Sequence, residues 1–278
     1  MPPVVGGNQL MQRRLILIVV AYHPSLEEVQ RLGRCLAALS QPIGYALVAN
    51  DHRPGEAIDQ LAEGADLFLP CAENLGYGRA VNRAVGVLQQ AVTAAGAMMP
   101  PCLGALNTDL QWQEGTMETA LAWLDQHADV VLAVPQLQDA HGVVQKLCKR
   151  HPTLLALFSR RFVPEPLKPA WLRRYDRWYV MADQEYGQIF EAPYLSGCCM
   201  LMRTSAFLAA GGFDERFFLY LEDADLTRTM AFQGRCVHLP LVVVTHHWGR
   251  GNHRSWWLTL VNLHSAWMYF CKWDLRWW

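Results

Sequence analysis

A repeated alternation of aliphatic runs with helical patterns constrains the fold of this 278-residue chain more than any other feature. Residues 15–20 form a continuous aliphatic run, which is typical of a strand buried on both faces. Pro24 and Ser25 then open a segment with apolar residues at helical spacing, and short strands follow at 45–49 and 66–69. The pattern predicts an α/β fold with a mostly parallel, Rossmann-like central sheet and helices on both faces. Ligands of such sheets bind at the carboxyl ends of the strands.

The second half of the chain is less regular. Strands are expected at 102–106 and 130–134, with a helix over 115–127 between them. A further strand over 237–245 carries Pro240, which favours a position at the edge of the sheet.

Composition excludes several classes of protein. The net charge of −1 gives no electrostatic basis for binding nucleic acid. The eight cysteines are scattered without a Cys-x-x-Cys pair, which argues against a zinc ribbon or a disulfide scaffold and favours a reducing cytoplasm. The first apolar run has only eight residues, lacks a small-residue cleavage site and is followed directly by a charged helical pattern, so it is interpreted as a buried strand rather than a signal peptide. No stretch reaches the roughly 18 apolar residues of a membrane span.

Two segments have an unusual composition. Residues 146–177 hold nine Lys and Arg against two acids, and their prolines predict an irregular segment that meets an anionic acceptor or a membrane surface. An ordinary solvated face is the alternative. Seven of the 11 tryptophans lie beyond residue 247, around an amphipathic helical pattern. That helix suits peripheral contact with a membrane, and packing on its own domain or on a partner chain, including a homodimer, are the alternatives.

Three carboxylates, Glu222, Asp223 and Asp225, follow the apolar run 217–221. Acids delivered to the edge of a core are costly unless they are paired, bind a metal or exchange protons with a substrate. Acidic residues also favour the first turn of a helix, which is the simpler interpretation.

Polar residues also follow the predicted strands, at Asn50-Asp51 and at Asn107-Thr-Asp109, where an acid is well placed to ligate a divalent cation. The Gly-x-Gly at 76–78 is a poor match to a dinucleotide-binding loop, because Val81 occupies the place of its third glycine.

Five ordered features together resemble the inverting GT-A glycosyltransferases of family 2, particularly their rhamnosyltransferase-like branch. They are Asn-x-Gly-x-Gly-x-x-x-Asn (74–82), Asn-Thr-Asp (107–109), Ser-Gly-Cys-Cys-Met-Leu-Met-Arg (196–203), Gly-Gly-Phe-Asp-Glu with Glu-Asp-Ala-Asp-Leu (211–226), and a His pair (246–247). The resemblance covers roughly residues 14–275. It implies a GT-A domain over 14–250, followed by an amphipathic helical tail over 251–278.

The resemblance also implies roles for the acids. Asp109 would ligate Mg²⁺ or Mn²⁺, with His246 or His247 as a further ligand. Asn107 replaces the first acid of the family motif, which leaves the metal one protein charge fewer. Asp223 would be the general base that takes the proton of the acceptor hydroxyl, with Glu222 as the next candidate.

The remaining expected roles concern a nucleoside-diphosphate sugar. The resemblance assigns the nucleobase to Asp51, with a register uncertain by one residue. The other residues expected to hold the donor are Asn74, Gly76, Arg79, Asn82, Asn107, Asp109 and Gly197.

The implied reaction moves rhamnose or another hexose, with inversion, to a hydroxyl of a cell-surface or exopolysaccharide glycan or a lipid-linked glycan. The enzyme is expected in the cytoplasm, with a place at the inner face of the plasma membrane left open. A non-catalytic nucleotide-sugar binding protein of the same fold is the alternative.

Overall fold

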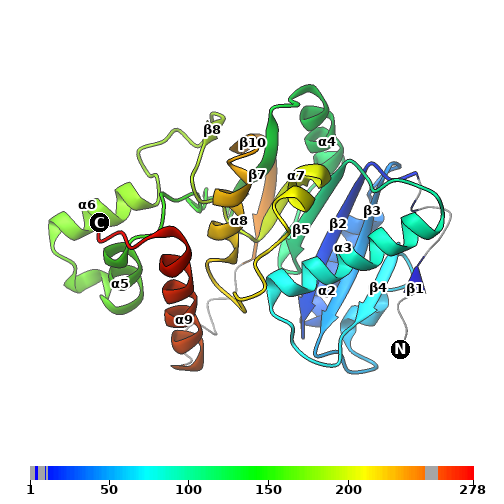
Figure 1. The fold of residues 1–278 in the computed structure, drawn as a ribbon, viewed down its shortest axis with the longest axis horizontal. Helices are drawn as coiled ribbons and strands as arrows, with labels where there is room; N and C mark the ends of the chain where they lie inside the picture. The colour runs from blue at the N-terminus through cyan, green and yellow to red at the C-terminus, as the bar shows by residue number, and fades with distance from the viewer. Residues whose placement is uncertain (1–3, 6–9, 11, 248–255) are drawn as a thin grey trace.

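The computed structural model describes every residue except 1–3, 6–9, 11 and 248–255. Within the described residues, ten strands form one sheet in the order β1-β4-β3-β2-β5-β9-β7-β10-β6, with β8 paired to β10 (Figure 1). The strands are β1 Val4–Val5, β2 Leu15–Tyr22, β3 Ile43–Asn50, β4 Leu67–Pro70, β5 Cys102–Asn107, β6 Leu110–Gln111, β7 Val130–Gln138, β8 Phe190–Glu191, β9 Cys199–Arg203 and β10 Arg235–His246.

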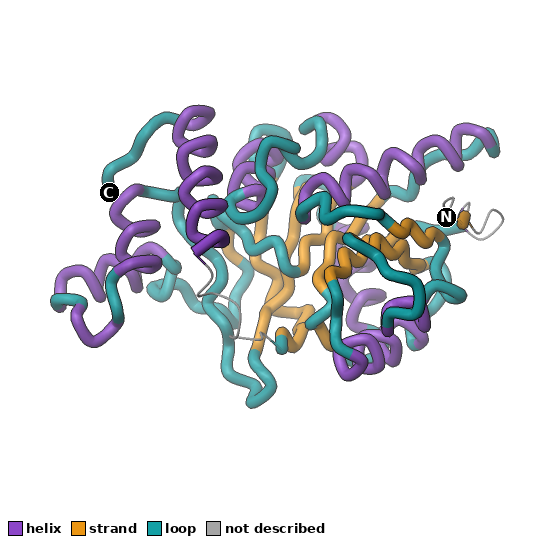
Figure 2. Tube along the Cα trace, turned by 90° about the horizontal axis from the view of Figure 1, so that it is seen from below, coloured by secondary structure: helices purple, strands orange, loops and turns teal. Residues whose placement is uncertain are grey.

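Helices cover both faces of this sheet (Figure 2). The helices of the described residues are α2 Leu26–Ala37, α3 Tyr77–Ala94, α4 Thr116–Gln126, α5 Leu154–Phe162, α6 Ala170–Tyr179, α7 Thr204–Ala209, α8 Glu222–Met230 and α9 Trp256–Trp273, with 3-10 turns at Ala57–Leu61 and Glu165–Leu167. Of these, α2 and α4 pack on one face of the sheet and α3, α7 and α8 on the other. The start of α2 shows how local sequence sets such elements. Ser25 and Glu28 form a capping box that satisfies backbone N–H groups of the first turn.

The aliphatic run of β2 is buried because the sheet has a core on each side. Ile16 and Ile18 pack in the cluster that contains α3, α7 and α8, whereas Leu15 and Leu17 pack in the cluster that contains α2 and α4. Successive strand residues point to opposite faces, so a strand covered on both faces has to be apolar at every position. The mostly parallel α/β fold predicted from the sequence is confirmed.

Strand β9 is the main exception to parallel pairing, because it runs antiparallel to both of its neighbours, β5 and β7. The predicted edge position of the strand with Pro240 is wrong. Strand β10 pairs with β7 on one side and with β6 and β8 on the other. The sheet tolerates Pro240 because it lies between Leu239 and Val243, where the register against β7 shifts.

The expected irregular segment over 146–177 is also wrong, since it contains α5 and α6. The prolines lie outside both helices: Pro152 precedes the N-cap of α5, and Pro164, Pro166 and Pro169 lie between α5 and α6, positions where a missing N–H is tolerated. Asp176 of α6 links this helix to α5 and to the connection between the two helices, because it accepts hydrogen bonds from Ser159 at 2.8 Å and from Lys168 at 2.6 Å. Figure 1 shows α5, α6 and α9 at the end of the molecule that carries the C terminus.

Helix α9 packs with its inner face against the segment that holds the acids. Ala266 and Tyr269 share a buried cluster with Phe217, Leu221 and Ala224. The outward side carries exposed apolar residues three or four positions apart, namely Trp256, Leu260, Leu263 and Trp267. No helix in the described part of the chain is long and apolar enough to cross a bilayer. The boundary expected at residues 250 and 251 lies outside the described residues.

Candidate active site

A cavity of about 440 Å³ opens at the carboxyl ends of β2, β3 and β5. Part of its polar lining comes from three segments that the sequence had indicated: Asn50 ends β3, Asn74 and Gly76 follow β4, and residues 107–109 lie at the end of β5. Tyr22 at the end of β2 and Glu28 of α2 also line it. Trp257 and Leu258 of α9 complete one side. We refer to it below as the donor cavity.

Gly76 brings the loop at 74–77 against the segment that precedes the acids. Its backbone is left-handed, with φ of 79°, and a Cβ at this position would clash with the carbonyl oxygen of Phe218. The N–H of Tyr77 donates a hydrogen bond to that same oxygen at 3.3 Å. A side chain at residue 76 would therefore separate two parts of the site.

The turn after β3 settles which residue faces the donor cavity. Of the two described residues at this turn, Asn50 lines the cavity and Asp51 does not. The Asn50 amide donates to the carbonyl of Gly76 and accepts from the N–H of Leu75, both at 3.3 Å. Asp51 instead accepts from His23 at 3.0 Å, and this hydrogen bond lowers the pKa of Asp51. The geometry thus favours Asn50, one residue before Asp51, as the residue of this turn that faces the donor cavity.

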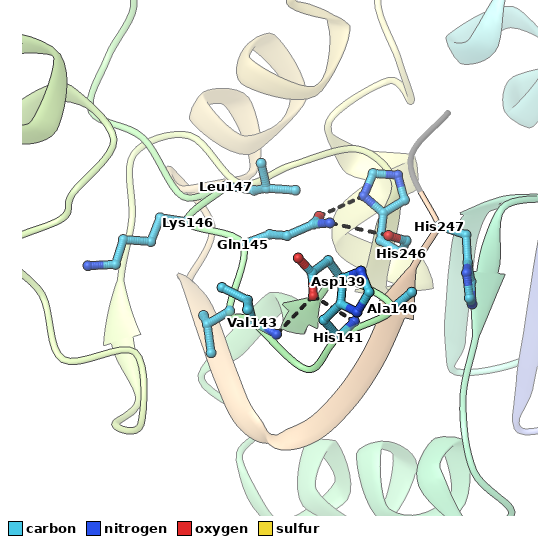
Figure 3. Close-up of a pocket in the computed structure, with 10 residues that line it drawn as sticks. Asp139, Ala140, His141, Val143, Gln145, Lys146, Leu147, His246 and His247 are labelled. Atoms are coloured by element: carbon cyan, nitrogen blue, oxygen red, sulfur yellow. Dashed lines mark hydrogen bonds between the residues drawn. The ribbon is translucent and has the colours of Figure 1, made fainter. Parts of the chain in front are cut away.

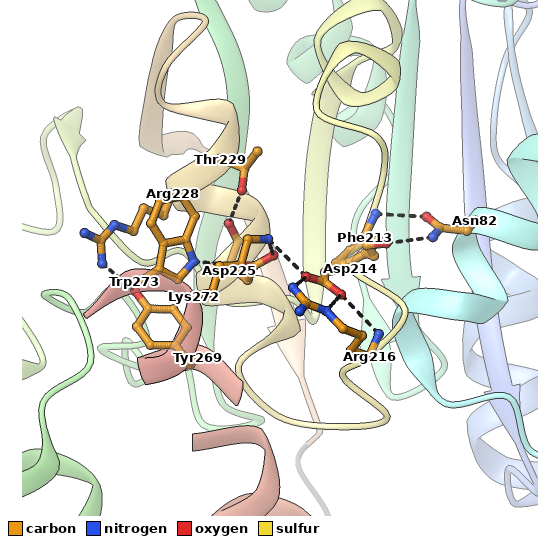
Figure 4. A network of polar contacts seen from close by, with 10 residues as sticks. All are labelled: Asn82, Phe213, Asp214, Arg216, Asp225, Arg228, Thr229, Tyr269, Lys272 and Trp273. Atoms are coloured by element: carbon orange, nitrogen blue, oxygen red, sulfur yellow. Dashed lines mark hydrogen bonds and ion pairs between the residues drawn. The ribbon is translucent and has the colours of Figure 1, made fainter. Parts of the chain in front are cut away.

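Arg79 and Asn82 lie apart from this cavity and hold a loop instead. The Asn82 amide exchanges hydrogen bonds with the backbone of Phe213 at 2.8 and 2.9 Å (Figure 4). The Arg79 guanidinium donates to the carbonyl of Glu215 at 2.7 Å. Both side chains therefore anchor the segment that leads to the acids, and neither is among the described residues that line the donor cavity.

Asp109 and His246 face one another across the end of the sheet. The Asp109 Oδ2 atom lies 3.3 Å from His246 Nε2, while the Nδ1 atom of the same imidazole lies 2.9 Å from Gln145 Oε1. His247 points in a different direction and pairs with Gln111 at 2.9 Å (Figure 3). Of the two histidines, His246 is therefore the one aimed at Asp109. It also borders a cavity of about 690 Å³ formed with residues 139–147.

The described residues contain no group of three or more His, Cys, Asp or Glu side chains that could hold a metal. Asp109 nevertheless fits a cation, because its Oδ1 atom is buried without a hydrogen-bond partner among the described residues. A buried carboxylate oxygen left in this state is costly unless a ligand satisfies it. Asp109 and His246 thus offer two ligands, which suits a cation whose other positions are filled by phosphate oxygens and water.

Asp223 lies at the start of α8, beside the turn at 196–197. Its Oδ2 atom accepts a hydrogen bond from the N–H of Gly197 at 2.9 Å, and its Oδ1 atom accepts one from the N–H of Ala224 at 2.9 Å. A Cβ on Gly197 would lie only 3.0 Å from that of Asp223, so glycine permits the close approach. The Tyr77 hydroxyl, at the donor cavity, donates to the carbonyl of Gly197 at 2.7 Å.

Asp109 and Asp223 approach the same region of the molecule. Burial raises the pKa of the Cys198 thiol to about 12, and the charges of both Asp109 and Asp223 add to this rise. The backbone of Cys198 lies between them, with its carbonyl accepting from the N–H of Asn107 at 3.0 Å. The two acids are 114 positions apart in the chain and are brought together by the antiparallel insertion of β9 beside β5.

The three neighbouring acids have different surroundings. Burial and the adjacent Asp223 charge raise the pKa of Glu222 to about 8, so its side chain is mainly protonated at neutral pH. Asp225 is buried and accepts hydrogen bonds from Lys272 at 2.8 Å and Trp273 at 2.6 Å, both on α9 (Figure 4). Asp223 alone of the three is half-buried and lies beside the Gly197 turn.

Sequence reasoning missed four residues that contribute to this region. Tyr77 lies inside the motif at 74–82, but the expected roles in that motif went to its glycine, arginine and asparagine residues. Tyr220 and Leu221 both have left-handed backbones, with φ of 70° and 65°, which no local pattern indicates for non-glycine residues. Lys149 is one of nine basic residues in its segment, and nothing in the sequence distinguishes it from the others.

Comparison with known proteins identifies the family. No family model matches the chain. A curated protein of Mycobacterium tuberculosis, N-acetylglucosaminyl-diphospho-decaprenol L-rhamnosyltransferase, is 31% identical over 281 aligned residues, which cover 94% of this chain and 89% of that protein.

Solved structures share the fold. A mannosyltransferase from Pyrobaculum calidifontis in complex with GDP-Man and Mn²⁺ aligns with a TM-score of 0.57 and 16% identity, over 92% of this chain and 63% of the other. TarS of S. aureus in complex with UDP-GlcNAc aligns with a TM-score of 0.53 and 16% identity, over 86% of this chain and 60% of the other. The chain therefore spans less than two thirds of these two structures. With the ordered motifs, the mixed sheet and the rhamnosyltransferase relative in agreement, the chain belongs to the GT-A glycosyltransferases of family 2.

Proposed function

We propose that this glycosyltransferase moves a hexose, with rhamnose as the first candidate, from a nucleoside-diphosphate sugar to a hydroxyl of a lipid-linked glycan, with inversion at the anomeric carbon. The observation that carries the proposal is geometric: Asp109 lines the donor cavity, and Asp223 is hydrogen-bonded to Gly197, whose neighbour Cys198 accepts a hydrogen bond from Asn107 of the Asp109 loop. The activity for which the mycobacterial relative is named supports the sugar and the lipid-linked acceptor.

On the donor side, the polar groups of the cavity suit a nucleotide. Asn50 and Asn74 present amide groups, and Asn107 and Asp109 lie at the end of β5. In this arrangement Asn50, rather than Asp51, contacts the nucleoside, and Gly76 admits close approach of the backbone. Arg79, Asn82 and Gly197 act indirectly, by holding the segments that carry the acids.

Asp109 and His246 would hold Mg²⁺ or Mn²⁺. When bound, the cation would offset the negative charge that develops on the leaving diphosphate. Gln145 keeps the His246 ring oriented toward Asp109, which is the positioning that a metal-ligating histidine needs from its second nitrogen.

On the acceptor side, Asp223 is the better base. As the acceptor oxygen bonds to the anomeric carbon, its proton passes to the Asp223 carboxylate and the bond from that carbon to the diphosphate oxygen breaks. Glu222 is less suited because its raised pKa leaves it mainly protonated at neutral pH. The N–H donors of Gly197 and Ala224 fix the Asp223 carboxylate, and each of its oxygens retains a lone pair for the substrate.

Substitution of Asp223 by asparagine tests the proposal. We expect Asp223→Asn to lower the transfer rate by at least about a hundredfold, because general-base catalysis contributes that much, while the donor is still bound. Asp129→Asn, the same change at a surface aspartate paired with Arg235, serves as the control. Transfer is followed by release of the nucleoside diphosphate, and donor binding by calorimetry.

Wild-type turnover in Asp223→Asn would refute the assigned base. Donor binding by the wild type without any turnover, over a panel of nucleotide sugars and glycan acceptors, would instead favour the non-catalytic binding protein.

A further inference from the structure

A second cavity, of about 260 Å³, lies on the α5 and α9 side of the acids and is separate from the donor cavity. Its polar lining comes from three cations, three tyrosines and one amide, namely Lys149, Arg160, Arg161, Tyr179, Tyr194, Tyr220 and Asn262. None of the described residues that line it is acidic. We call it the basic cavity. It shares no lining residue with the donor cavity.

Two cations of this cavity, Lys149 and Arg160, have no acid within ion-pairing distance among the described residues. Lys149 is half-buried, its ammonium lies 4.0 Å from the centre of the Tyr194 ring, and it forms no ion pair among the described residues. Arg160 likewise has no ion pair in the described part of the chain. Burial and the nearby Arg160 charge lower the pKa of Lys149, while the charge of Asp223 opposes them. Like charges held together in a cavity favour an anionic ligand.

Backbone structure fixes Lys149 in place. Lys149 and Tyr194 exchange backbone hydrogen bonds at 2.9 and 3.1 Å, in an isolated antiparallel bridge. Tyr194 lies two residues before Ser196 and Gly197, which form the turn that holds Asp223. Lys149 is thus hydrogen-bonded to one end of the segment 194–197, and Asp223 is hydrogen-bonded to the other end.

The chain between the two cavities is strained. Phe218 and Leu219 line the donor cavity, whereas Tyr220 and Leu221 line the basic cavity. The latter two adopt left-handed backbones, with φ of 70° and 65°, immediately before Glu222 and Asp223. Strain of this kind persists where the surrounding structure requires it and is frequent at functional sites.

We propose that the basic cavity binds the diphosphate of a diphosphate-linked glycan acceptor, with Lys149 and Arg160 on its oxygens, so that the attached sugar presents its hydroxyl to Asp223. This proposal rests on the proposed function, since it requires a sugar acceptor. The ammonium of Lys, the guanidinium of Arg and the hydroxyl of Tyr all donate hydrogen bonds, and phosphate oxygens accept them.

The surroundings of the cavity also fit the lipid end of such an acceptor. Phe158 and Phe162 on α5, and Leu260 and Leu263 on α9, are exposed apolar side chains on two of the helices that contribute residues to the cavity lining. A prenyl chain leaving the diphosphate would meet these side chains rather than polar surface.

The test compares two acceptors of the same sugar. One carries the sugar on a diphosphate with a short prenyl chain, and the other carries it on an uncharged alkyl group. We expect Lys149→Gln and Arg160→Gln to raise KM for the diphosphate acceptor about tenfold, the cost of one charge-assisted hydrogen bond, with KM for the donor and for the alkyl glycoside unchanged. Lys149→Arg should restore most of the affinity. Arg174→Gln, the same change on the exposed surface of α6, is the control.

Three outcomes would overturn the assignment. A rise in KM for the donor would place the donor diphosphate in this cavity. An equal loss with the alkyl glycoside would make the two residues structural. An equal rise in KM with Arg174→Gln would show that the effect comes from the overall positive charge of the basic segment and not from binding in the cavity.

Binding of inorganic pyrophosphate without divalent cation supplies a readout that needs no turnover. The wild type should bind it by calorimetry and Lys149→Gln should bind it at least about tenfold more weakly. Failure of the proposed function is distinguishable, because it would abolish transfer to both acceptors in the wild type. Failure of the cavity assignment would leave that transfer intact without preference for the diphosphate acceptor.

Discussion

Asp109 combines a buried oxygen without a partner with an oxygen that faces His246. That combination predicts a specific effect of Asp109→Asn. Loss of the charge should remove the stimulation of donor binding by Mn²⁺ and leave metal-free donor binding nearly unchanged, because the cavity itself is retained. Calorimetric titration of the donor with and without Mn²⁺ measures both quantities.

His247→Ala is the matched control for that experiment, since His247 pairs with Gln111 rather than Asp109. An unchanged response to Mn²⁺ in Asp109→Asn would contradict the assignment of the cation site.

Glu222 gives a prediction for the dependence of stability on pH. Its folded-state pKa, about 8, lies above its ordinary value of 4.5, so the folded protein binds this proton more tightly than the unfolded chain does. The contribution of Glu222 to the free energy of unfolding is therefore fully present below about pH 4.5 and is lost as the pH rises toward 8. Glu222→Gln removes the titration.

The difference in Tm between Glu222→Gln and the wild type should accordingly shift in favour of the variant by about 2 °C or more between pH 5 and pH 8.5. Glu114→Gln, at an exposed position, should show no such shift. A difference that is constant with pH, measured by calorimetry, would show that Glu222 ionises normally.

At the scale of secondary-structure elements, the contact of α9 with α8 supports the catalytic region. The indole N–H of Trp273 donates to the buried carboxylate of Asp225 at 2.6 Å, and the Arg228 guanidinium lies 4.4 Å from the centre of the Trp273 ring. We expect Trp273→Phe to lower the free energy of unfolding by about 1.5–3 kcal/mol, the value of a hydrogen bond to a charged group.

Trp267→Phe on the same helix is the matched control, because Trp267 is 61% exposed. It should change the free energy of unfolding in urea by less than about 0.5 kcal/mol. Equal losses in the two variants would mean that α9 contributes no specific anchor to α8.

At the scale of the whole molecule, the arrangement places the basic segment and the outward face of α9 at one end (Figure 1). Exposed Trp256, Leu260, Leu263 and Trp267 lie at the end that also holds α5 and α6, which together carry five arginines. This combination suits peripheral contact with an anionic membrane surface, the location of a lipid-linked acceptor.

Co-sedimentation with vesicles tests that contact. Binding should be stronger to vesicles containing phosphatidylglycerol than to phosphatidylcholine alone, and the double change Leu260→Ser with Leu263→Ser should weaken it about tenfold or more. Met98→Ser, which changes an exposed apolar residue just beyond α3, should leave binding intact. Equal binding of all variants would exclude α9 as the contact.

The sequence by itself determined the alternation of strands and helices, the positions of the polar loops and the family. Aliphatic runs such as 15–20 and the capping residues at Ser25 and Glu28 act locally, so their periodicity can be read directly. The acids at 109 and 223 were also identified from motifs whose spacing is fixed along the chain.

Tertiary structure alone decided which polar side chains meet. Asn50 faces the donor cavity and Asp51 turns to His23, although they are adjacent in sequence. Asn82 binds the backbone of Phe213 from 131 positions away, and Lys149 lies beside the Asp223 region only because its strand bridge pairs it with Tyr194. Such contacts depend on packing between distant segments, and no local pattern of apolar and polar residues encodes that packing.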